Sequence, residues 1–524
     1  MARIQEAKKV LKAIVGEKNF SDDPIVCQAY SRGGYGKFFW DRGRKVPGCV
    51  VLPGSTQEVQ SIVKVANRYR MPFIPIGTFF ISLCVPTEPN TIMVDMRRMD
   101  QLVIDEENML ALVEPYVTYT ELVTEAMKVG LYTSAPSCGA QVSVLANHLN
   151  QGMGQLVHRV GYANRRVLAA EWVLPNGEIL KTGSAALSED CFWGEGPGPD
   201  LRGLMRGWFG HYGGMGIVTK MAVKLFHLPF KGIPEQIGIS PRTAFKLPED
   251  RFKWFVLYYP DSIKAVDAMY QIGHAEIGAV VVRIPFIWRY ISQAKSREDF
   301  WEQWEKHRPS EGEVTPSMVR VLLCGFTSKE QLEYEERVLR DIAKETGSEI
   351  REATPFSSGH VFKLGISNNP AVPAGFFGVT KYAFDSFDHA RHALQETKDL
   401  KKRVIPPFVD DREESGWMQS YDMGHIGYGE FFSYYDRSMT DLFEEYQEAS
   451  IRHDIGMRAF PSAHFPQYEH ILGPAMMNYD RIMRKVGETF DPLHISNPPR
   501  MAPTRRIKRN NRQRGEDHGN KKSA

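Results

Sequence analysis

Histidine, tyrosine and glutamate, the residue types best suited to acid–base chemistry, gather late in the chain over Tyr421–Arg437 (YDMGHIGYGEFFSYYDR). His425 could act as a general base, because imidazole titrates near neutral pH. Tyr428 and Glu430 could bind or deprotonate a hydroxyl group of a substrate. The stretch is also rich in glycine, and a single histidine or tyrosine in a glycine-rich turn is more often a hydrogen-bonded structural residue than a catalyst. The sequence leaves both interpretations open.

Two further candidates follow this stretch. His464 could act as a general base for the same reason as His425. Arg458 could clamp a carboxylate or a phenolate, because its planar guanidinium presents several N–H donors in a fixed fork. The candidate catalytic residues are therefore His425, Tyr428, Glu430, Arg458 and His464.

A second informative stretch is Ser134–Gly183, whose first half is crowded with small residues. Glycine and alanine leave room for close approach, so the backbone there is expected to lie against something flat or against another backbone. A large flat ligand and a close helix crossing explain this stretch equally well. The small residues are Ser134, Ala135, Ser137, Gly139, Ala140, Ser143, Ala146, Gly152 and Gly154.

Two turns flank strands in the same region. Pro175-Asn176-Gly177 separates two short apolar runs, and Asn-Gly at such a place predicts a tight β-hairpin. Clustered glycines in Gly213–Lys220 lead directly into the alternating run MAVKLF. Such a turn is typical of a place where the backbone approaches a ligand or a phosphate group.

The elements that must position these residues follow from apolar periodicity and turn signals. The first half predicts a strand–helix–strand–loop–strand order in which a loop, Gly77–Ser82, stands at a strand end. Ser55 with Glu58 three residues later predicts the helix start. The predicted elements are strands at 48–53, 73–76, 91–95 and 110–114 and helices at 57–70 and 119–129.

A second α+β region is predicted over about 249–400, where the short runs FVLYY, AVVVRI and MVRVLLCGF alternate with helices such as Ser328–Thr346. Val404–Trp417 is predicted to be loop-like. Helices are predicted at Thr440–His453 and Tyr479–Phe490.

Composition narrows the class of protein. A chain of 524 residues is too long for one ordinary core, so two or three domains are expected. No run approaches 18 consecutive apolar residues, so no membrane span is expected. The amphipathic start lacks the apolar core of a secretory signal, and the six cysteines show no zinc or CxxC spacing, which together predict a cytoplasmic protein with reduced thiols. The net charge of +2 indicates no nucleic-acid partner.

Five segments together resemble the FAD-linked oxidoreductases of the vanillyl-alcohol oxidase and p-cresol methylhydroxylase superfamily. They span about Gly48 to Pro498 and occur in the order and spacing of that family. The segments are VVLPGSTQEVQSIVKVANRYRMPFIPIG, IMVDMRRMDQLVIDEENMLALVEPYVTYTEL, EWVLPNGEILKTG, GGMGIVTKMAVKL and FDPLHISNP.

The resemblance implies an α+β fold with a two-subdomain FAD-binding domain of the PCMH type, an α+β cap that shapes the substrate site, and a C-terminal segment that returns to the FAD domain. The implied boundaries are 1–229 for the FAD-binding domain, 230–455 for the cap, 456–503 for the C-terminal FAD-contacting segment and 504–524 for a basic tail. The tail carries eight Lys or Arg and no apolar pattern, so it is expected to be disordered.

The resemblance also implies FAD as the cofactor. Gly77 and its neighbours would offer backbone N–H groups to the pyrophosphate. Family members usually carry several glycines in this loop, whereas this chain has Phe79-Phe80. The implied cofactor-binding residues are Pro75, Ile76, Gly77, Thr78, Phe79, Ser82, Pro136, Ser137, Cys138, Gly139, Val144, Asn147, Gly152, Gly216, Ile217, Val218 and Asn497.

The implied activity is transfer of a hydride from a small hydroxylated substrate to flavin N5, with an aromatic substrate favoured. The alternatives are an FAD-linked 2-hydroxy-acid dehydrogenase and a flavin-poor structural subunit of a redox complex. Gly424–Phe432 resembles the His-rich motif of the 2-hydroxy-acid branch, but Tyr428 replaces its acidic residue and its later histidine is absent, so no metal is expected. Tyr428 is also a candidate for covalent flavin attachment. The expected partners are a small-molecule substrate, an electron-acceptor protein or quinone, and a second copy of the chain or a larger complex.

Overall fold

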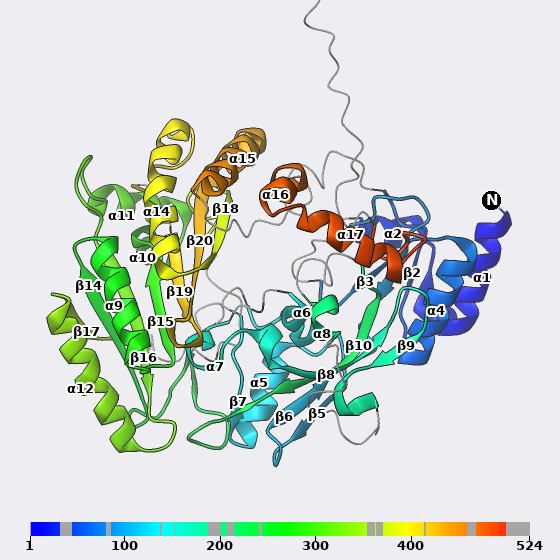
Figure 1. The fold of residues 1–524 in the computed structure, drawn as a ribbon, viewed down its shortest axis with the longest axis horizontal. Coiled ribbons are helices and arrows are strands. Elements are labelled where there is room, and N and C mark those ends of the chain that lie inside the picture. The colour runs from blue at the N-terminus through cyan, green and yellow to red at the C-terminus, as the bar shows by residue number, and fades with distance from the viewer. Residues whose placement is uncertain are drawn as a thin grey trace, which may run out of the picture.

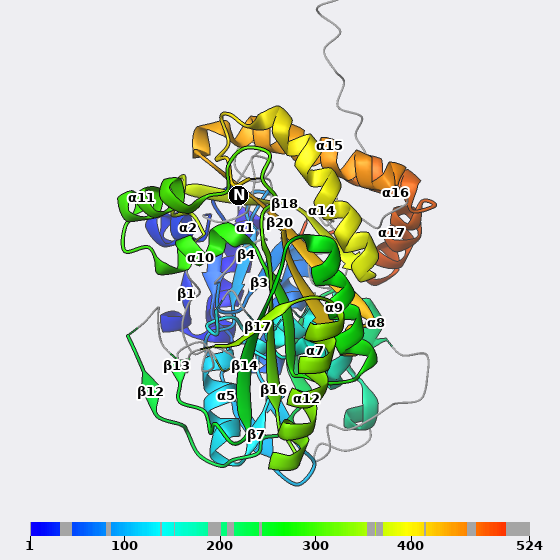
Figure 2. The ribbon, with the colours of Figure 1, turned by 90° about the vertical axis from the view of Figure 1, so that its left-hand side faces the viewer.

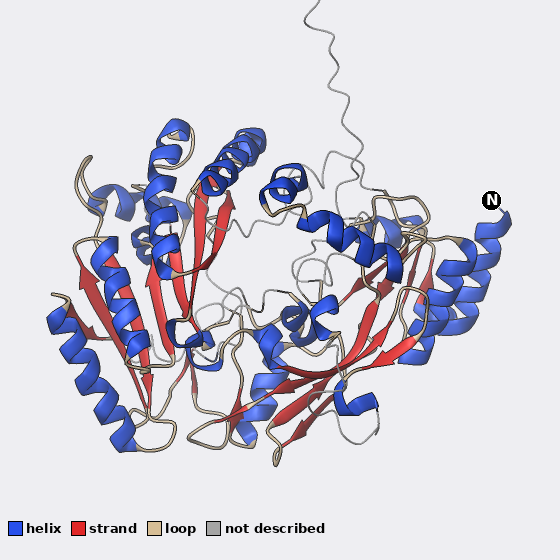
Figure 3. Cartoon of the chain, viewed as in Figure 1, coloured by secondary structure: helices blue, strands red, loops and turns tan. Residues whose placement is uncertain are grey.

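The computed structural model describes residues 2–31, 45–79, 85–136, 139–150, 152, 154–186, 201–206, 214–239, 244–353, 362, 370–412, 416–457 and 468–498. Within these residues the larger sheets have four, five and seven strands. Figure 1 shows the two smaller ones on one side of the molecule and the seven-stranded sheet on the other. Figure 3 shows helices packed beside each of these sheets, as the predicted α+β class requires.

The four-stranded sheet carries the predicted loop at 77–82. Strands β2, β4 and β3 run parallel to one another, and β1 pairs with β2 in the antiparallel sense. Helices α1 and α4 bury Leu11, Val59 and Ile62 in the same core as Val51 and Val94 of the sheet. The order is β1 (Phe20–Ser21), β2 (Cys49–Val51), β4 (Ile92–Asp95) and β3 (Phe73–Ile76), with α1 at Ala2–Val15, α2 at Pro24–Tyr30 and α4 at Thr56–Tyr69.

Helix α4 begins where the sequence predicts. The Ser55 side chain accepts a hydrogen bond from the Glu58 N–H, which satisfies one of the orphan donors of the first turn. The Glu58 carboxylate accepts from the Gly54 N–H at 2.8 Å, one residue earlier than a standard capping box requires. The predicted serine cap is confirmed, and the glutamate secures the preceding turn.

The five-stranded sheet is antiparallel throughout, and it contains the predicted hairpin. Leu174 N–H donates to Glu178 O, and Gly177 has φ 86°, a left-handed conformation that glycine adopts at low cost. The order is β5 (Leu102–Asp105), β6 (Leu110–Val113), β10 (Ile217–Lys224), β8 (Val167–Val173) and β9 (Ile179–Lys181). Between β6 and β8 lie α5 (Tyr119–Lys128), β7 (Leu131–Tyr132), α6 (Val144–Leu149), α7 (Val157–Val160) and the 3-10 turn at Ala163–Arg166.

The seven-stranded sheet lies in the cap and is antiparallel between every pair of neighbours. Strands β14, β15 and β16 confirm the three apolar runs predicted there, and α12 confirms the predicted helix. The strand order is β17 (Glu349–Glu352), β14 (Phe252–Tyr259), β16 (Ser317–Cys324), β15 (Val280–Ile284), β19 (Gly416–Tyr421), β20 (Ile426–Tyr435) and β18 (Phe376–Asp385). Its helices are α9 (Ser262–His274), α10 (Phe286–Gln293), α11 (Arg297–His307), α12 (Lys329–Glu345), α14 (Phe387–Lys401) and α15 (Thr440–Gly456).

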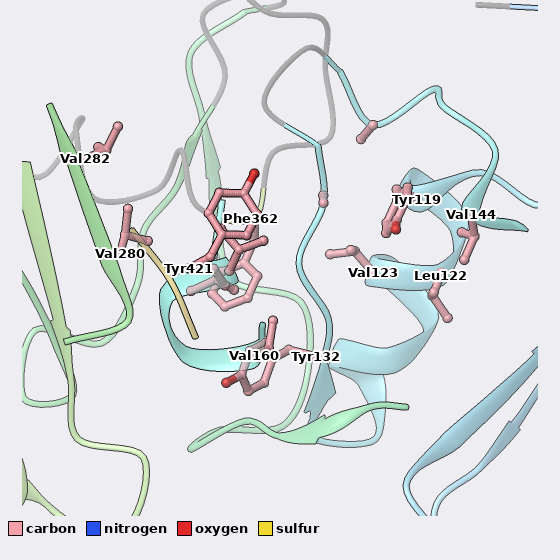
Figure 4. Close-up of a cluster of buried hydrophobic side chains, with 14 of the residues drawn as sticks. Tyr119, Leu122, Val123, Tyr132, Val144, Val160, Val280, Val282, Phe362 and Tyr421 are labelled. Atoms are coloured by element: carbon pink, nitrogen blue, oxygen red, sulfur yellow. The ribbon is translucent and has the colours of Figure 1, made fainter. Parts of the chain in front are cut away.

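The two faces of this sheet have different neighbours. One face packs against α9, α12 and α14 through a core that includes Met269, Leu339, Phe387 and Phe431, and Figure 2 shows α9 and α12 beside β14 and β16. The opposite face joins a core of the N-terminal region, residues 1–229, which the resemblance predicts to bind FAD and which is called the FAD-binding half below. Figure 4 shows this shared core, where Val280, Val282 and Tyr421 of the cap lie in one cluster with Tyr119, Leu122 and Tyr132.

The glycine-rich stretch over Tyr421–Arg437 is mostly strand, because Ile426–Tyr435 forms strand β20 between β19 and β18. Gly427 serves packing, since a Cβ there would meet the Phe387 backbone at 2.7 Å. A turn does precede the strand at Asp422–Gly424.

The chain ends by returning to the four-stranded sheet. Helices α16 (Glu469–Ala475) and α17 (Tyr479–Phe490) lead to a segment in which Ile495 O accepts from Phe73 N–H and Asn497 N–H donates to Phe73 O. Figure 1 shows α17 crossing above β3. Among the described helices, none is both long enough and apolar enough to cross a membrane.

Candidate functional site

The loop that follows β3 offers unused backbone donors. Gly77 and Thr78 are half-buried, and within the described residues their N–H groups donate to no protein atom. Gly77 also lies against Ser143, because a Cβ on Gly77 would be 3.4 Å from the Ser143 Cβ. Consecutive free N–H groups at a strand end are suited to bind an anion such as a diphosphate.

Phe79 occupies this loop in a conformation that glycine normally takes. Its φ is 57°, and its side chain is 38% exposed. The Phe79 ring lies 6.1 Å from the Tyr30 ring, and the Tyr30 hydroxyl donates to Asp95 Oδ2 at 2.6 Å. The aromatic contact gives the exposed ring a partner, so the backbone keeps a left-handed turn without glycine. Ser82 lies outside the described residues.

Two glycines of the small-residue stretch, and one of the turn that leads into β10, approach other protein atoms. A Cβ on Gly152 would collide with Ala163, one on Gly154 with Ser134, and one on Gly216 with the Val173 carbonyl. The close-backbone explanation therefore holds for these positions. Gly152 and Gly154 are buried, whereas Gly216 is half-buried and keeps a face open to a ligand.

The other predicted cofactor residues lie at several places in the FAD-binding half and in the C-terminal segment. Asn147 Nδ2 donates to the Tyr119 hydroxyl at 2.9 Å, and Val144 is buried beside it on α6. Gly216 N–H donates to Ser496 Oγ at 3.1 Å, which joins it to the C-terminal segment next to Asn497. The remaining predicted residues lie at strand ends and in a turn. Pro75 and Ile76 end β3, and Ile217 and Val218 begin β10. Pro136 O accepts a hydrogen bond from Gly139 N–H. Ser137 and Cys138 lie outside the described residues.

Tyr428 and Glu430 lie two residues apart on β20, so their side chains share the face that turns toward the FAD-binding half. The Tyr428 hydroxyl donates a short hydrogen bond to Glu430 Oε1. Burial raises the pKa of Glu430 to about 7, and the Tyr428 hydrogen bond opposes that rise. Glu430 is half-buried, whereas Tyr428 is fully buried. A carboxyl group poised near neutral pH is suited to accept a proton.

Aromatic rings surround this pair. The Trp417 and Tyr421 rings contact the Tyr428 ring edge to face at 5.6 and 5.7 Å. Further along the same face, Phe432 contacts Trp288 at 5.0 Å. The pair therefore sits in an apolar, aromatic wall of the cap.

A buried cation, Arg166, interacts electrostatically with Tyr421. Arg166 is 2% exposed and donates from Nη1 to Thr133 Oγ1 at 2.7 Å, but its Nε and Nη2 find no hydrogen-bond partner among the described residues. Burial lowers the pKa of Arg166. Burial and then the charge of Glu430 raise the pKa of Tyr421, and the charge of Arg166 opposes them. Tyr421 is thus within electrostatic reach of both groups.

Of the remaining catalytic candidates, the structure describes His425. His425 is exposed at the end of the Asp422–Gly424 turn, where its N–H donates to Asp422 O. Arg458 and His464 lie outside the described residues. Sequence reasoning missed Trp417, Gln419 and Tyr421, although their i, i+2, i+4 spacing in GWMQSY is a strand signal that places them on one face.

Known proteins match this chain in sequence and in fold. Residues 47–183 match the family described as FAD binding domain. The glycolate oxidase subunit GlcD of Bacillus subtilis is 29% identical over 230 residues, which are 43% of this chain and 46% of that subunit. The chain spans less than half the length of the curated relatives it matches first.

Two solved structures share the fold over nearly the whole chain. p-Cresol methylhydroxylase with bound substrate has a TM-score of 0.74 at 16% identity and covers 96% of this chain and 97% of its own. The 4-ethylphenol oxidase of Gulosibacter chungangensis, in complex with isoeugenol, has a TM-score of 0.70 at 18% identity and covers 95% of this chain and 96% of its own.

The residues of the site fit FAD. The N–H groups of Gly77 and Thr78, which have no partner in the described part of the chain, suit its diphosphate, and they lie inside the matched segment. The predicted α+β fold, with a cap facing the FAD-binding half, is the fold of the two solved neighbours. Residues 47–183 therefore form a domain of the FAD-binding family, the chain as a whole has the p-cresol methylhydroxylase fold, and FAD is its cofactor.

Proposed function

We propose that this protein is an FAD-dependent oxidoreductase that oxidises a small hydroxylated aromatic substrate. The observation that carries the proposal is the Tyr428–Glu430 pair, in which a half-buried carboxyl group has a pKa of about 7. The pair lies among the aromatic rings of Trp417 and Tyr421, which suit the flat face of an aromatic substrate.

The division of labour follows from the chemistry of alcohol oxidation. The bound flavin supplies the acceptor for the hydride that leaves the substrate carbon. The substrate hydroxyl must lose its proton, and Glu430 in its carboxylate form accepts that proton at Oε2. The Tyr428 hydroxyl stabilises the carboxylate through Oε1 and holds it in one orientation. The surrounding rings exclude water from the proton transfer.

The cofactor is held in this proposal by the predicted residues of the FAD-binding half. Gly77 and Thr78 would bind the diphosphate through their N–H groups. Pro136–Gly139, Val144 and Asn147 would face the flavin, and Gly216–Val218 and Asn497 would lie beside the rest of the cofactor. A protein or quinone acceptor would reoxidise the flavin, and a homodimer or larger complex would be the working assembly.

A second candidate is oxidation of a 2-hydroxy acid. The sequence similarity to the glycolate oxidase subunit favours it. The buried, partly unpaired Arg166 also supplies a positive charge close to Tyr421, which would suit a substrate carboxylate.

The experiment is a comparison of kcat/KM for the FAD-loaded protein with an artificial electron-accepting dye. The substrates are 4-hydroxybenzyl alcohol and 4-ethylphenol on one side and glycolate and D-lactate on the other. The proposal expects an aromatic substrate to exceed both hydroxy acids by at least about tenfold. Preference for a hydroxy acid would replace it with the second candidate, and turnover of neither class would reject both.

A further inference from the structure

The end of strand β19 contacts the FAD-binding half through consecutive side chains. Gln419 Nε2 donates to Gly154 O and Gln155 O, both at 2.9 Å. The Ser420 hydroxyl lies 2.6 Å from His158 Nδ1, and the Tyr421 ring lies 4.8 Å from the Tyr162 ring. Asp422 then forms a short ion pair with Arg165 and lies against Gly161. Residues 419–422 are therefore matched in order to the segment 154–165.

Gln419 contacts the part of this segment that is hydrogen-bonded to Ser134 and Ala135, just before the residues assigned to the flavin. Gln155 N–H donates to Ala135 O at 2.9 Å, and Leu156 N–H donates to Ser134 Oγ at 2.8 Å. Pro136–Gly139, which is assigned to the flavin, begins one residue later. The hydrogen bonds thus run from the Gln419 amide to the 154–156 turn and from that turn to residues 134 and 135.

The burial of Gln419 makes these bonds hard to replace. Its side chain is 0% exposed, so water cannot substitute for its two donated bonds. No other described side chain donates a hydrogen bond to Gly154 O or Gln155 O. Loss of the Gln419 amide would leave both carbonyls without these partners, and the turn would be free to shift.

We propose that Gln419 is a positioning residue for FAD, which acts from the cap by fixing the 154–156 turn and, through it, Ser134 and Ala135, which directly precede Pro136. Docking of the cap and binding of FAD are then thermodynamically coupled, because each favours the same position of this turn. The inference rests on the assignment of residues 136–139 to the flavin.

The test is FAD binding to apoprotein, measured by fluorescence titration, for the wild type, Gln419→Met and Ser433→Ala. Methionine keeps the volume of Gln419 and removes its donors. Ser433 is the control, because its hydroxyl shares a buried hydrogen bond with Thr380 at 3.0 Å in the same sheet, away from the 154–156 turn. The expected result is a rise in Kd of at least tenfold for Gln419→Met and less than twofold for Ser433→Ala, at a similar loss of Tm.

Unchanged FAD affinity in Gln419→Met overturns the inference, and so does an equal rise in Kd in both variants. If Gln419→Met fails to fold, amide hydrogen exchange is measured in Gln419→Glu instead. The inference predicts faster exchange than in the wild type at the Gln155 and Leu156 amides. Exchange at the wild-type rate would count against the inference. A wild-type apoprotein that binds no FAD would instead reject the cofactor role on which the proposed function depends.

Discussion

The Tyr428 hydroxyl donates a hydrogen bond to Glu430, two residues further along strand β20, and both side chains face the FAD-binding half. Strand periodicity makes this pairing possible, because residues i and i+2 lie on the same side of a sheet. The same face carries Phe432 and Tyr434, so a polar pair is embedded in an aromatic surface. The strand geometry of β20 therefore places the proposed base, Glu430, beside the tyrosine that hydrogen-bonds to it.

The rate of flavin reduction should depend on the ionisation of Glu430. In the proposed mechanism the carboxylate is the active form, and the pKa of Glu430 is about 7, so the rate should rise with pH and level off above about pH 8. Glu430→Gln should lower the rate by about 100-fold or more and flatten this profile. Stopped-flow absorbance at several pH values measures both effects.

Glu335→Gln is the matched control for Glu430→Gln. Glu335 is also a buried carboxyl group with a raised pKa, and it accepts a hydrogen bond from Gly278 N–H away from the β20 pair. The control should leave the pH profile of the wild type in place. A profile that changes equally in both variants would contradict the assignment of the base.

Tyr428→Phe should shift the pH profile of the flavin-reduction rate to higher pH and keep its shape. The hydrogen bond from Tyr428 lowers the pKa of Glu430, so its loss should raise that pKa and shift the midpoint of the rate profile to higher pH. The same stopped-flow series gives the midpoint. A midpoint at or below that of the wild type would show that the hydrogen bond does not tune Glu430.

Acid should weaken the contact between the cap and the FAD-binding half through His158. Ser420 and the Ile277 carbonyl contact its two ring nitrogens, and burial lowers its pKa to about 4. Because the pKa is about 6.5 in the unfolded chain, that state binds more protons between pH 6.5 and 4, and stability falls as pH falls through this window. His158 should account for about 2 kcal/mol of the loss between pH 7 and pH 5.

Urea unfolding of the wild type and His158→Gln at pH 7 and pH 5 measures this term. His148, whose pKa burial lowers to about 3, acts in the same direction and remains in the variant. The variant should therefore lose less stability than the wild type on acidification, though not zero. An identical loss in both proteins would exclude the role of His158.

Substitutions at Gly161 and Asp422 should have strongly non-additive effects on the free energy of unfolding. Gly161 has φ 69°, and a Cβ there would collide with the Asp422 carboxylate. Asp422→Ala should cost less than about 1 kcal/mol, because its partner Arg165 is 62% exposed. Gly161→Ala should cost more than about 2 kcal/mol, from the left-handed backbone and the collision.

The double variant tests the collision directly. Removal of the Asp422 carboxylate should return the cost of Gly161→Ala to about 1 kcal/mol, the part due to backbone conformation. Simple addition of the two single costs in denaturant unfolding would show that the carboxylate does not exclude a side chain at position 161.

The Phe79→Gly protein should be more stable to unfolding than the Phe79→Ala protein. Both substitutions remove the Tyr30 contact, but only glycine adopts φ 57° without strain, so Phe79→Gly should exceed Phe79→Ala in unfolding free energy by about 1 kcal/mol. At Thr78, whose φ is not positive, the order should reverse. Equal stabilities of the two Phe79 variants would mean that the loop relaxes out of the left-handed turn.

Local patterns predicted the elements that have clear signals. Helix α4 shows helical apolar spacing and a serine cap, and α17 begins and ends at the predicted residues. Strand β20 was missed because its glycines resemble a turn and because both of its faces are buried, which removes the polar–apolar alternation of an exposed strand.

The candidate site was only partly predictable, because its contacts join distant parts of the chain. Tyr428 and Glu430 stood out as chemistry-bearing residues two positions apart. Gln419 did not, since its partners Gly154 and Gln155 lie more than 260 residues earlier. The unpaired nitrogens of Arg166 likewise become visible only when the fold shows that no described side chain pairs with them.

The most direct test of the account is anaerobic mixing of the FAD-loaded protein with 4-hydroxybenzyl alcohol while the oxidised-flavin band at about 450 nm is recorded. The account predicts that the band bleaches in the wild type within one turnover and that bleaching is slowed at least about 100-fold in Glu430→Gln. A band that persists in the wild type, or that bleaches equally fast in both proteins, would contradict it.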